Sequence, residues 1–358
     1  MSLNVTFDDF DPPIVYSNPS DWVTPDPSVN PTWYNASEEV TGVPWHEATY
    51  HFTSVPGAKA SLNFTSTSLW IYGFVGPSSP SNYSITIDPL SAHPFSQSYS
   101  TQNTSSGSGS GSGRTLLYGT TGLRYAEHTV EITNWGSGVG LDLVVINAEL
   151  GADEATLTNS TIDDAQTTVT YTGNWTSEGG DFYGTSIYTQ GPDNSFGFNF
   201  SGSGLYIFGD QVDDHGLYSI YLNSSYTPWL DNPSRPVATL DGRSGCGGGY
   251  KKACEKLGGL RWFVGGLPMG NHRVVVVNEG PGEGNRTYFD FDYAVITTPS
   301  TYSSRSLITN ASCPFTDCSV QGISTNTLSA TSASPTGTAS PSAASKSAAR
   351  RAGIEPLA

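Results

Sequence analysis

The sequence predicts an all-β protein, with two tandem jelly-roll-like β-sandwiches followed by a disordered tail rich in Ser and Thr. Three observations lead to this fold class. The apolar residues are rich in Val, Ile, Tyr, Phe and Trp, which favour pleated sheet. Segments of strand character are separated by clusters of Gly, Pro, Ser and Asn. One ordered set of these segments occurs twice along the 358 residues.

The duplication begins with an Asp pair followed by a Tyr and then a Trp, in Thr6–Trp22 and again in Thr161–Trp175. Four further matches keep the same order: Ser68–Val75 with Gly204–Val212, Asn82–Asp88 with Leu217–Asn223, Glu127–Gly136 with Asn271–Gly280, and Leu141–Asn147 with Phe291–Thr297. A repeat this long indicates two whole domains, which we place at residues 4–150 and 158–298.

Each matched segment has the character of a strand. Residues 130–134 and 84–88 alternate apolar and polar side chains, as half-buried strands do. Residues 273–278 and 141–146 are nearly continuous apolar runs, suited to a sandwich core. Helical periodicity is almost absent, and its best candidate is residues 250–260. Superposing the two domains is expected to pair three sets of residues: Tyr16 with Tyr171, Asp142 with Asp292, and His128 with His272.

The two domains differ mainly in one insertion. The first carries a flexible Gly-Ser loop at Ser105–Gly113, whereas the second carries a long insertion at residues 224–254. We expect a Cys246–Cys254 disulfide to close that insertion and a Cys313–Cys318 disulfide to follow the second domain, although four cysteines allow three connectivities. Zinc is the competing interpretation, but neither pair has the Cys-x-x-Cys spacing or a neighbouring His.

Residues 319–358 consist largely of Ser, Thr, Ala and Pro, a composition that cannot bury a core. This composition predicts an O-glycosylated, disordered stalk, suited to linking the domains to an anchor. No apolar run approaches the roughly 20 residues that a membrane helix needs, so we expect no membrane span in this chain. The start at Met1 has no signal peptide, which predicts a processed secretory chain with an added Met.

Composition and charge indicate an extracellular protein. Charged residues make up only 13% and the net charge is −17, with no basic stripe, which argues against nucleic acid or an anionic membrane as partner. Asn-x-Ser/Thr sequons are more frequent than chance predicts, which points to a secreted or cell-surface glycoprotein. These predicted glycosylation sites are Asn4, Asn35, Asn63, Asn82, Asn103, Asn159, Asn174, Asn199, Asn223, Asn285 and Asn310.

The order of the repeated motifs resembles the galactose-binding-like jelly-roll modules that occur in tandem in fungal secreted proteins. The resemblance rests on the Asp pair with its Tyr and Trp, then "LWIYG", "YSITID", "EHTVEITN" and "LDLVVI" in that order. It covers residues 4–150 and 158–298. It implies glycan binding at loops on one edge of a sandwich, often with a structural calcium ion, and attachment to a cell wall or to a membrane helix that follows a Ser/Thr-rich stalk.

The Asp pairs are the first candidates for chemistry, at Asp8 and Asp9 and again at Asp163 and Asp164. Capping of local N–H groups is the favoured interpretation; calcium binding and catalysis are the alternatives. Neighbouring strand residues point to opposite faces, so we expect that an adjacent pair cannot easily share one substrate. Structural roles are favoured for His128 and His272, which precede strands, and for Asp142 and Asp292, which need hydrogen-bond partners inside an apolar strand.

The acidic loop Gly209–Tyr218 is the best candidate for ligand binding, because its counterpart in the first domain has no carboxylate. A solvated loop is the bland interpretation, and binding of a cation or of sugar hydroxyls is the functional one. Rings for sugar stacking and forked guanidinium donors come from the long insertion. The predicted ligand-binding residues are Asp210, Asp213, Asp214, His215, Trp229, Asp231, Arg235 and Arg243.

Other aromatic residues could form a sugar platform or simply fill the cores: Trp22, Trp33, Tyr34, Trp45, Trp175, Tyr183 and Trp262. No signature of a catalytic triad or a nucleotide-binding loop occurs, so we assign no catalytic residue and expect no cofactor beyond a structural calcium ion. The sequence therefore favours a non-catalytic protein that binds a polysaccharide or glycan. The alternatives are a glycoside-processing enzyme with carboxylates in a cleft, and a structural or adhesive ectodomain of a single-pass membrane protein.

Overall fold

The computed structural model describes residues 1–24, 44–76, 81–101, 114–179, 184–224, 235–243, 255–281, 287–309 and 311–318. Over these ranges the regular structure is antiparallel strand, with two short 3₁₀ turns at Pro19–Asp21 and His46–Ala48. The predicted all-β class is therefore confirmed, whereas the predicted disordered stalk lies outside the described residues. Among the described residues, no helix is long and apolar enough to cross a membrane.

The first half of the chain forms two five-stranded sheets. One sheet contains β1 (Ser2–Asp8), β10 (Val139–Glu149), β5 (Leu69–Val75) and β8 (Thr115–Thr120) in that order, with β3 (His51–Thr53) also paired to β10. The other contains β2 (Ile14–Tyr16), β4 (Lys59–Ser66), β9 (Ala126–Asn134), β6 (Ser81–Ile87) and β7 (Phe95–Thr101). We call these strands the first sandwich.

The second half of the chain repeats this order of strands, except that three of its strands form a separate sheet. One sheet contains β11 (Leu157–Asp163), β22 (Tyr293–Pro299), β16 (Gly204–Val212) and β19 (Glu255–Val264). The opposite sheet contains β12 (Thr170–Thr172), β15 (Ser195–Phe200), β20 (His272–Gly280), β17 (Leu217–Ser224) and β18 (Ala238–Asp241). A separate three-stranded sheet contains β13 (Thr176–Gly179), β14 (Thr185–Thr189) and β21 (Phe289–Phe291). We call these strands the second sandwich.

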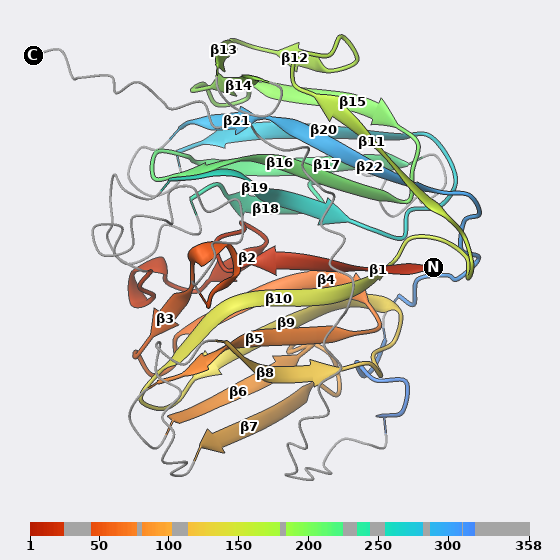
Figure 1. The fold of residues 1–358 in the computed structure, drawn as a ribbon. Helices are drawn as coiled ribbons and strands as arrows, with labels where there is room; N and C mark the ends of the chain where they lie inside the picture. Colours follow the sequence, from red (N-terminus) through yellow and green to blue (C-terminus); the bar gives the residue numbers. More distant parts are fainter. Residues whose placement is uncertain are drawn as a thin grey trace, which may run out of the picture.

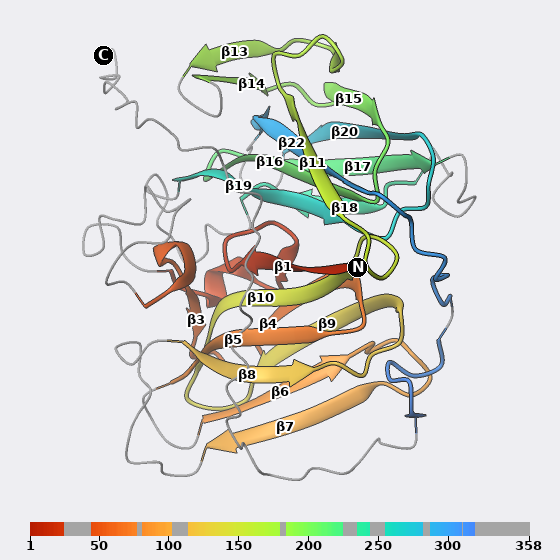
Figure 2. The ribbon, with the colours of Figure 1, turned by 45° about the vertical axis from the view of Figure 1, so that its right-hand side comes forward.

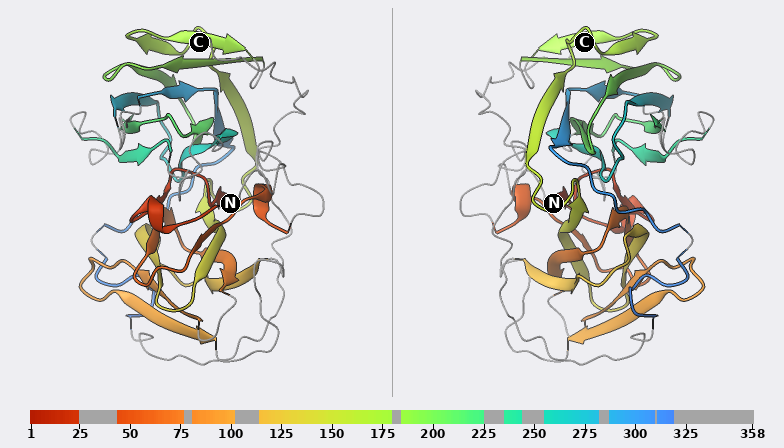
Figure 3. Two further views of the ribbon diagram at one scale, coloured as in Figure 1. Left: turned by 90° about the vertical axis from the view of Figure 1, so that its left-hand side faces the viewer. Right: turned by 90° about the vertical axis from the view of Figure 1, so that its right-hand side faces the viewer.

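The two sandwiches are stacked, with β1 and β10 of the first facing β18 and β19 of the second (Figure 1). The side views show the same stack from two directions (Figure 3). Each sandwich encloses an apolar cluster, and the cluster of the first also takes in Tyr206, Leu260, Tyr293 and Val295 from the second. The junction between the sandwiches is therefore itself a buried apolar contact.

The best helical candidate, residues 250–260, is not a helix in the part that the structure describes, because residues from Glu255 onward belong to β19. This strand pairs with β16 along most of its length, with register shifts near Phe208 and Gly209. A helix of two turns is only marginally stable by itself, whereas pairing with β16 satisfies the backbone N–H and C=O groups of this segment. The tertiary contact therefore overrides the local helical pattern.

Equivalent contacts recur in the two sandwiches. The backbone N–H of Asp9 donates to the carbonyl of Asp142 at 3.0 Å, and Asp164 donates to Asp292 at the same distance. The Tyr16 hydroxyl donates to the carbonyl of Asp9 at 2.7 Å. In the second sandwich Tyr171 makes the same bond to Asp164 at 2.9 Å. Tyr16 and Tyr171 thus occupy equivalent places, as do Asp142 and Asp292.

The expectation that His128 and His272 precede strands is wrong, because His128 lies within β9 and His272 is the first residue of β20. The two histidines nevertheless correspond. Nε2 of His128 lies 2.8 Å from the carbonyl of Arg124, and Nε2 of His272 lies 3.0 Å from the carbonyl of Pro268. Each contact reaches back four residues to the preceding turn, as expected for a structural histidine. These repeated contacts match the sequence repeat, whereas the limits at residues 4–150 and 158–298 stay predictions.

A buried ion-pair cluster joins the sandwiches. The Lys256 ammonium on β19 lies 2.5 Å from Asp8 Oδ2 and 2.5 Å from Glu47 Oε2, and 4.0 Å from Asp11 Oδ1. Asp11 Oδ1 also accepts from the backbone N–H of Leu260 at 3.1 Å. Lys256 is fully buried, and burial opposes its charge, but the neighbouring carboxylates outweigh burial and raise its pKa well above the usual value.

The segment after β22 also connects the two sandwiches. From residue 300 the chain runs down along the first sandwich, as the blue trace shows (Figure 2). The Phe315 ring packs edge-on against Phe95 at 5.1 Å, and the N–H of Arg124 donates to the carbonyl of Pro314 at 2.8 Å. The predicted Cys313–Cys318 disulfide is present in this segment.

We predict that Lys256→Met destabilises the protein by about 3–5 kcal/mol, because it leaves buried carboxylates without their cation. Chemical denaturation of the full chain measures the change. The matched control is Lys59→Met, since Lys59 pairs with Glu131 at 3.0 Å at the surface and its loss should cost less than about 1 kcal/mol. Equal losses for the two variants would contradict this account of the junction.

Candidate functional site

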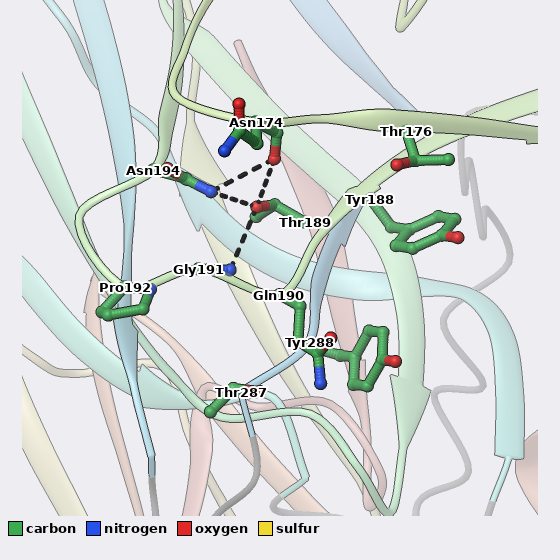
Figure 4. A pocket seen from close by; sticks show the side chains of 10 residues that line it. All are labelled: Asn174, Thr176, Tyr188, Thr189, Gln190, Gly191, Pro192, Asn194, Thr287 and Tyr288. Carbon is green, nitrogen blue, oxygen red and sulfur yellow. Dashed lines mark hydrogen bonds between the residues drawn. The ribbon is translucent and has the colours of Figure 1, made fainter.

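An open groove lies on the second sandwich, between the β13–β14 hairpin and the segment that enters β21. Its volume is about 750 Å³, within the range of small-ligand sites. Figure 4 shows the lining, which consists of amides, hydroxyls, two aromatic rings and turn residues. These residues are Asn174, Thr176, Tyr188, Thr189, Gln190, Gly191, Pro192, Asn194, Thr287 and Tyr288.

A hydrogen-bonded turn fixes one wall of the groove. The Thr189 hydroxyl donates to the carbonyl of Asn174 at 2.8 Å, and the Asn194 amide donates to the same carbonyl at 3.1 Å (Figure 4). The N–H of Gly191 donates to Thr189 Oγ1 at 3.3 Å. Asn194 also packs against Gly173, where φ is +91° and where a Cβ would overlap the Asn194 amide. This wall is therefore held in place before any ligand arrives.

The two tyrosine rings supply the aromatic surface. Tyr188 and Tyr288 are both half-buried, with ring centroids 6.1 Å apart and planes inclined by 43°. Such rings can stack on the C–H faces of a sugar while amides and hydroxyls bond its hydroxyl groups. The lining thus combines the two kinds of contact that neutral sugars need.

Tyr288 is held by the acidic loop that the sequence singles out. Its N–H donates to the carbonyl of Asp214 at 3.2 Å, and its carbonyl accepts from the N–H of Gly216 at 3.0 Å. Between these residues, His215 forms an isolated parallel bridge with Tyr288. The loop therefore contributes to the groove through its backbone, by positioning a ring.

Behind this loop lies a buried charged network. Nε2 of His215 lies 2.7 Å from Asp290 Oδ1, and Nδ1 lies 3.0 Å from Asp214 Oδ1. Arg261 donates to Asp290 and to the carbonyl of Asp210, while its guanidinium lies over the Phe289 ring at 4.9 Å. Burial raises the pKa of the Asp290 carboxyl, but Arg261 and His215 outweigh burial and lower it. The carboxylate is therefore paired on both sides.

In the same network, burial would lower the pKa of His215, yet its hydrogen bonds to Asp214 and Asp290 raise it. Both ring nitrogens face carboxylate oxygens, so the doubly protonated ring satisfies both partners. These two contacts favour the protonated ring and fasten the loop to the sandwich.

In the first sandwich, aromatic rings occupy the position that corresponds to the groove. Strand pairing places Phe52 opposite Gly140, where the second sandwich has Tyr188 opposite Asp290. Phe52 stacks on Phe74 at 5.6 Å, and a Cβ on Gly138 or Gly140 would overlap these two rings. An aromatic stack thus lies in the first sandwich where the second has an open groove and an ionic network.

The predicted ligand-binding residues differ in their burial and in whether the structure describes them. Asp210 and His215 are buried in the network, so the solvated-loop interpretation is wrong for them, whereas Asp214 is exposed and Asp213 is half-buried. Arg243 bonds to Asp241 through its backbone N–H at 3.0 Å, and Arg235 is exposed. Trp229 and Asp231 lie outside the described residues. A direct ligand contact by any of the eight stays a prediction.

Of the two Asp pairs, Asp8, Asp9 and Asp164 are buried, whereas Asp163 is half-buried. β1 ends at Asp8, so Asp9 lies in a turn and the Thr49 hydroxyl reaches both, at 3.1 Å from Asp8 Oδ2 and 2.8 Å from Asp9 Oδ1. The expectation that adjacent aspartates point apart is therefore wrong here. The capping interpretation is correct for Asp8, whose Oδ2 accepts from the N–H of Phe10 at 3.2 Å. Asp9 Oδ2 lies 2.5 Å from His51 Nδ1.

The second pair keeps one contact of the first pair, the hydrogen bond from a threonine hydroxyl. Asp164 Oδ1 accepts from the Thr185 hydroxyl at 2.7 Å, as Asp9 does from Thr49. In the described part of the chain, no cluster of three or more His, Cys, Asp or Glu side chains is arranged to hold a metal ion. The cation beside Asp8 is the Lys256 ammonium. A calcium ion at Asp8, Asp9, Asp163 or Asp164 stays a prediction, which thermal unfolding with calcium and with chelator would test.

The remaining predicted features are the glycosylation sites, the aromatic residues and the second cysteine pair. Asn63, Asn159, Asn174 and Asn199 are exposed, and Asn4 and Asn82 are half-buried. Asn35, Asn103, Asn285, Asn310, Trp33, Tyr34, Tyr183 and the Cys246–Cys254 pair lie outside the described residues, as does the side chain of Asn223. Trp22, Trp45 and Trp262 are buried in the sandwiches, and Trp175 is half-buried against Tyr171, so these rings contribute to packing.

The comparisons with known proteins give one distant relative in sequence. No protein-family model matches the chain. A segment is 23% identical over 185 residues to "A type blood alpha-D-galactosamine galactosaminidase" from Flavonifractor plautii. The match covers 51% of this chain and 15% of that enzyme, so the chain spans a small part of its relative's length.

Among solved structures, an esterase with two domains, active on acetylated mannans and crystallised with mannopentaose, gives a TM-score of 0.27 at 14% identity, covering 40% of this chain and 36% of the esterase. The ANXUR2 extracellular domain from Arabidopsis thaliana gives 0.27 at 9% identity, covering 84% and 97%. The CBM22-1–CBM22-2 tandem domain of Paenibacillus barcinonensis Xyn10C gives 0.23 at 11% identity, covering 83% and 97%. TM-scores this low support no conclusion about function.

We predict that the stability of the folded chain falls as pH rises from about 4 to about 7, through its buried carboxyls. Burial raises the pKa of Asp142 to about 7, with Asp8 adding to the shift, and burial likewise raises the pKa of Asp11 to about 7. Since these folded-state pKa values lie above the unfolded value, the folded chain holds protons that the unfolded chain releases, and each group can cost up to about 1.4 kcal/mol per pH unit.

Asp142→Asn should make this fall shallower, measured by chemical denaturation at each pH. Its amide oxygen can still accept from the N–H of His46, which donates to Asp142 Oδ1 at 2.8 Å. The control is Asp153→Asn at an exposed position, which should leave the slope unchanged. A slope for Asp142→Asn equal to that of the unaltered chain would contradict the assigned pKa direction.

Proposed function

We propose that this protein is an extracellular, non-catalytic glycan-binding protein whose groove at Tyr188 and Tyr288 binds a neutral oligosaccharide segment. The observation that carries the proposal is the lining itself, in which two aromatic rings face amides and hydroxyls on a preformed wall. A preformed wall loses less entropy on binding than a loop that must order. Stacking and a few hydroxyl bonds should give an affinity on the order of 10–1,000 μM.

The disulfide and the exposed sequons support an extracellular setting. The Cys313–Cys318 disulfide is typical of oxidising compartments, and several sequon asparagines are exposed. The sequence match to a galactosaminidase is compatible with a sugar-related role, although it covers only part of that enzyme. Attachment to a cell wall, or to a membrane through the stalk, belongs to the same proposal.

The alternative is glycoside processing. Such an enzyme needs two carboxyl groups about 5–10 Å apart on either side of the bond that it cleaves. The described residues that line the groove are amides, hydroxyls, rings and turn residues, a set suited to holding a sugar. A structural or adhesive ectodomain is the further alternative, and it would bind no sugar here.

We predict that Tyr188→Ala and Tyr288→Ala each weaken binding about tenfold, because each removes a stacking ring. Calorimetry of the full chain with tetrasaccharides from mannan, xylan, β-glucan and galactan measures the affinity. The matched control is Trp135→Ala, which removes an exposed ring of the first sandwich, 56% exposed, and should leave binding unchanged.

The same panel separates the alternatives. A tenfold loss in Trp229→Ala, with the tyrosine variants unchanged, would move the site to the long insertion. Release of reducing sugar during the titration would show glycoside processing in place of simple binding. Binding that is lost in Trp135→Ala alone would place the site on the first sandwich and contradict the proposal.

A further inference from the structure

We propose that an N-linked glycan on Asn174 covers the groove and controls its access to free glycans. The inference rests on the proposed function, because it concerns the same groove. It starts from a coincidence of two features: residues 174–176 form an Asn-Trp-Thr sequon, and both Asn174 and Thr176 line the groove. Of the sequon asparagines whose side chains are described, Asn174 is the one in the lining.

The local structure presents the acceptor amide outward. The carbonyl of Asn174 is held by Thr189 and Asn194, while its carboxamide is exposed. Between the two sequon ends, Trp175 turns inward, with its ring 5.0 Å from Tyr171 and its Nε1 donating to the carbonyl of Thr172 at 3.0 Å. The packed Trp thus fixes Asn174 at the rim of the groove.

Thr176 brings the sequon next to the aromatic surface. It is paired with Tyr188 across the β13–β14 hairpin, and Figure 4 shows its side chain beside that ring. A sugar attached to Asn174 therefore starts within the lining of the groove. The first N-acetylglucosamine carries an apolar face of the kind that stacks on tyrosine, so the attached glycan and a free glycan would compete for the same rings.

The modification itself needs a lipid-linked oligosaccharide diphosphate as donor. The Asn174 Nδ2 forms a bond to the anomeric carbon of the first N-acetylglucosamine, while the bond from that carbon to the diphosphate oxygen breaks. The lipid diphosphate leaves with the bonding electrons, and the amide nitrogen loses one proton. No oxidation or reduction takes place.

The test uses the full chain secreted from a eukaryotic host. Peptide mass spectrometry before and after amidase deglycosylation should show Asn174 occupied. Asn174→Gln and Thr176→Ala remove the sequon through different side chains, and Thr176→Ser keeps it. Both sequon-lacking variants should bind the tetrasaccharide panel at least about tenfold more tightly than the glycosylated chain, whereas Thr176→Ser should still show Asn174 occupied in the mass spectra.

Asn199→Gln is the matched control, because Asn199 is an exposed sequon residue at the far end of β15 from Asn194. It should leave binding unchanged. A second readout needs no ligand: nitration of Tyr188 and Tyr288, mapped by mass spectrometry, should be slower in the glycosylated chain than in Asn174→Gln.

An unmodified Asn174 in the secreted chain would overturn the inference. Equal binding by the glycosylated chain and both sequon-lacking variants would also overturn it, while leaving the proposed function intact. Binding by none of the forms, including Asn174→Gln, would overturn both proposals. Equal nitration rates in glycosylated and sequon-lacking chains would show that the glycan does not cover the rings.

Discussion

The buried contact of Lys256 with Asp8 and Glu47 is the constraint on which the arrangement of the two sandwiches depends. An ammonium and carboxylates removed from water are tolerated only when they stay paired, so the two sandwiches cannot separate without exposing or unpairing them. Lys256 lies on β19, paired with Gln211 on β16. Gln211 reaches Asp11 of the first sandwich, whereas Asp210, one residue earlier, is bonded by Arg261 within the second. The same two strands thus support both the junction and the network behind the groove.

The duplicated sandwiches have diverged at one equivalent position. In the first, Gly138 and Gly140 leave room for the stacked rings of Phe52 and Phe74, which close the surface. In the second, Tyr288 directly precedes β21 and Asp290 lies on it, and the ionic network around Asp290 replaces the aromatic stack. The backbone scaffold is retained while the side chains change from a filled apolar cluster to an open polar groove. The second sandwich therefore has an open groove where the first has packed rings.

The sequence predicts what local pattern determines. The repeated strand segments, the equivalence of Tyr16 with Tyr171, and the structural roles of His128 and His272 all follow from periodicity and repetition. It misses what long-range contact determines. Lys256 meets Asp8 across 248 residues, and its segment has a helical pattern that strand pairing overrides. Tyr188 and Tyr288 come together only through the pairing of β14 with β21, so no local motif marks them. The Asn174 sequon was visible, but its place in the groove was not.

The central claim is that the groove of the second sandwich binds a glycan. A crystal structure of the full-length Asn174→Gln variant, grown with the tetrasaccharide that it binds most tightly, tests this claim most directly. The account predicts difference density for a sugar ring stacked on Tyr188 or Tyr288, with hydroxyl groups within hydrogen-bond distance of the lining amides. A sugar bound on the first sandwich, or bound only by the insertion at residues 224–254, would contradict it.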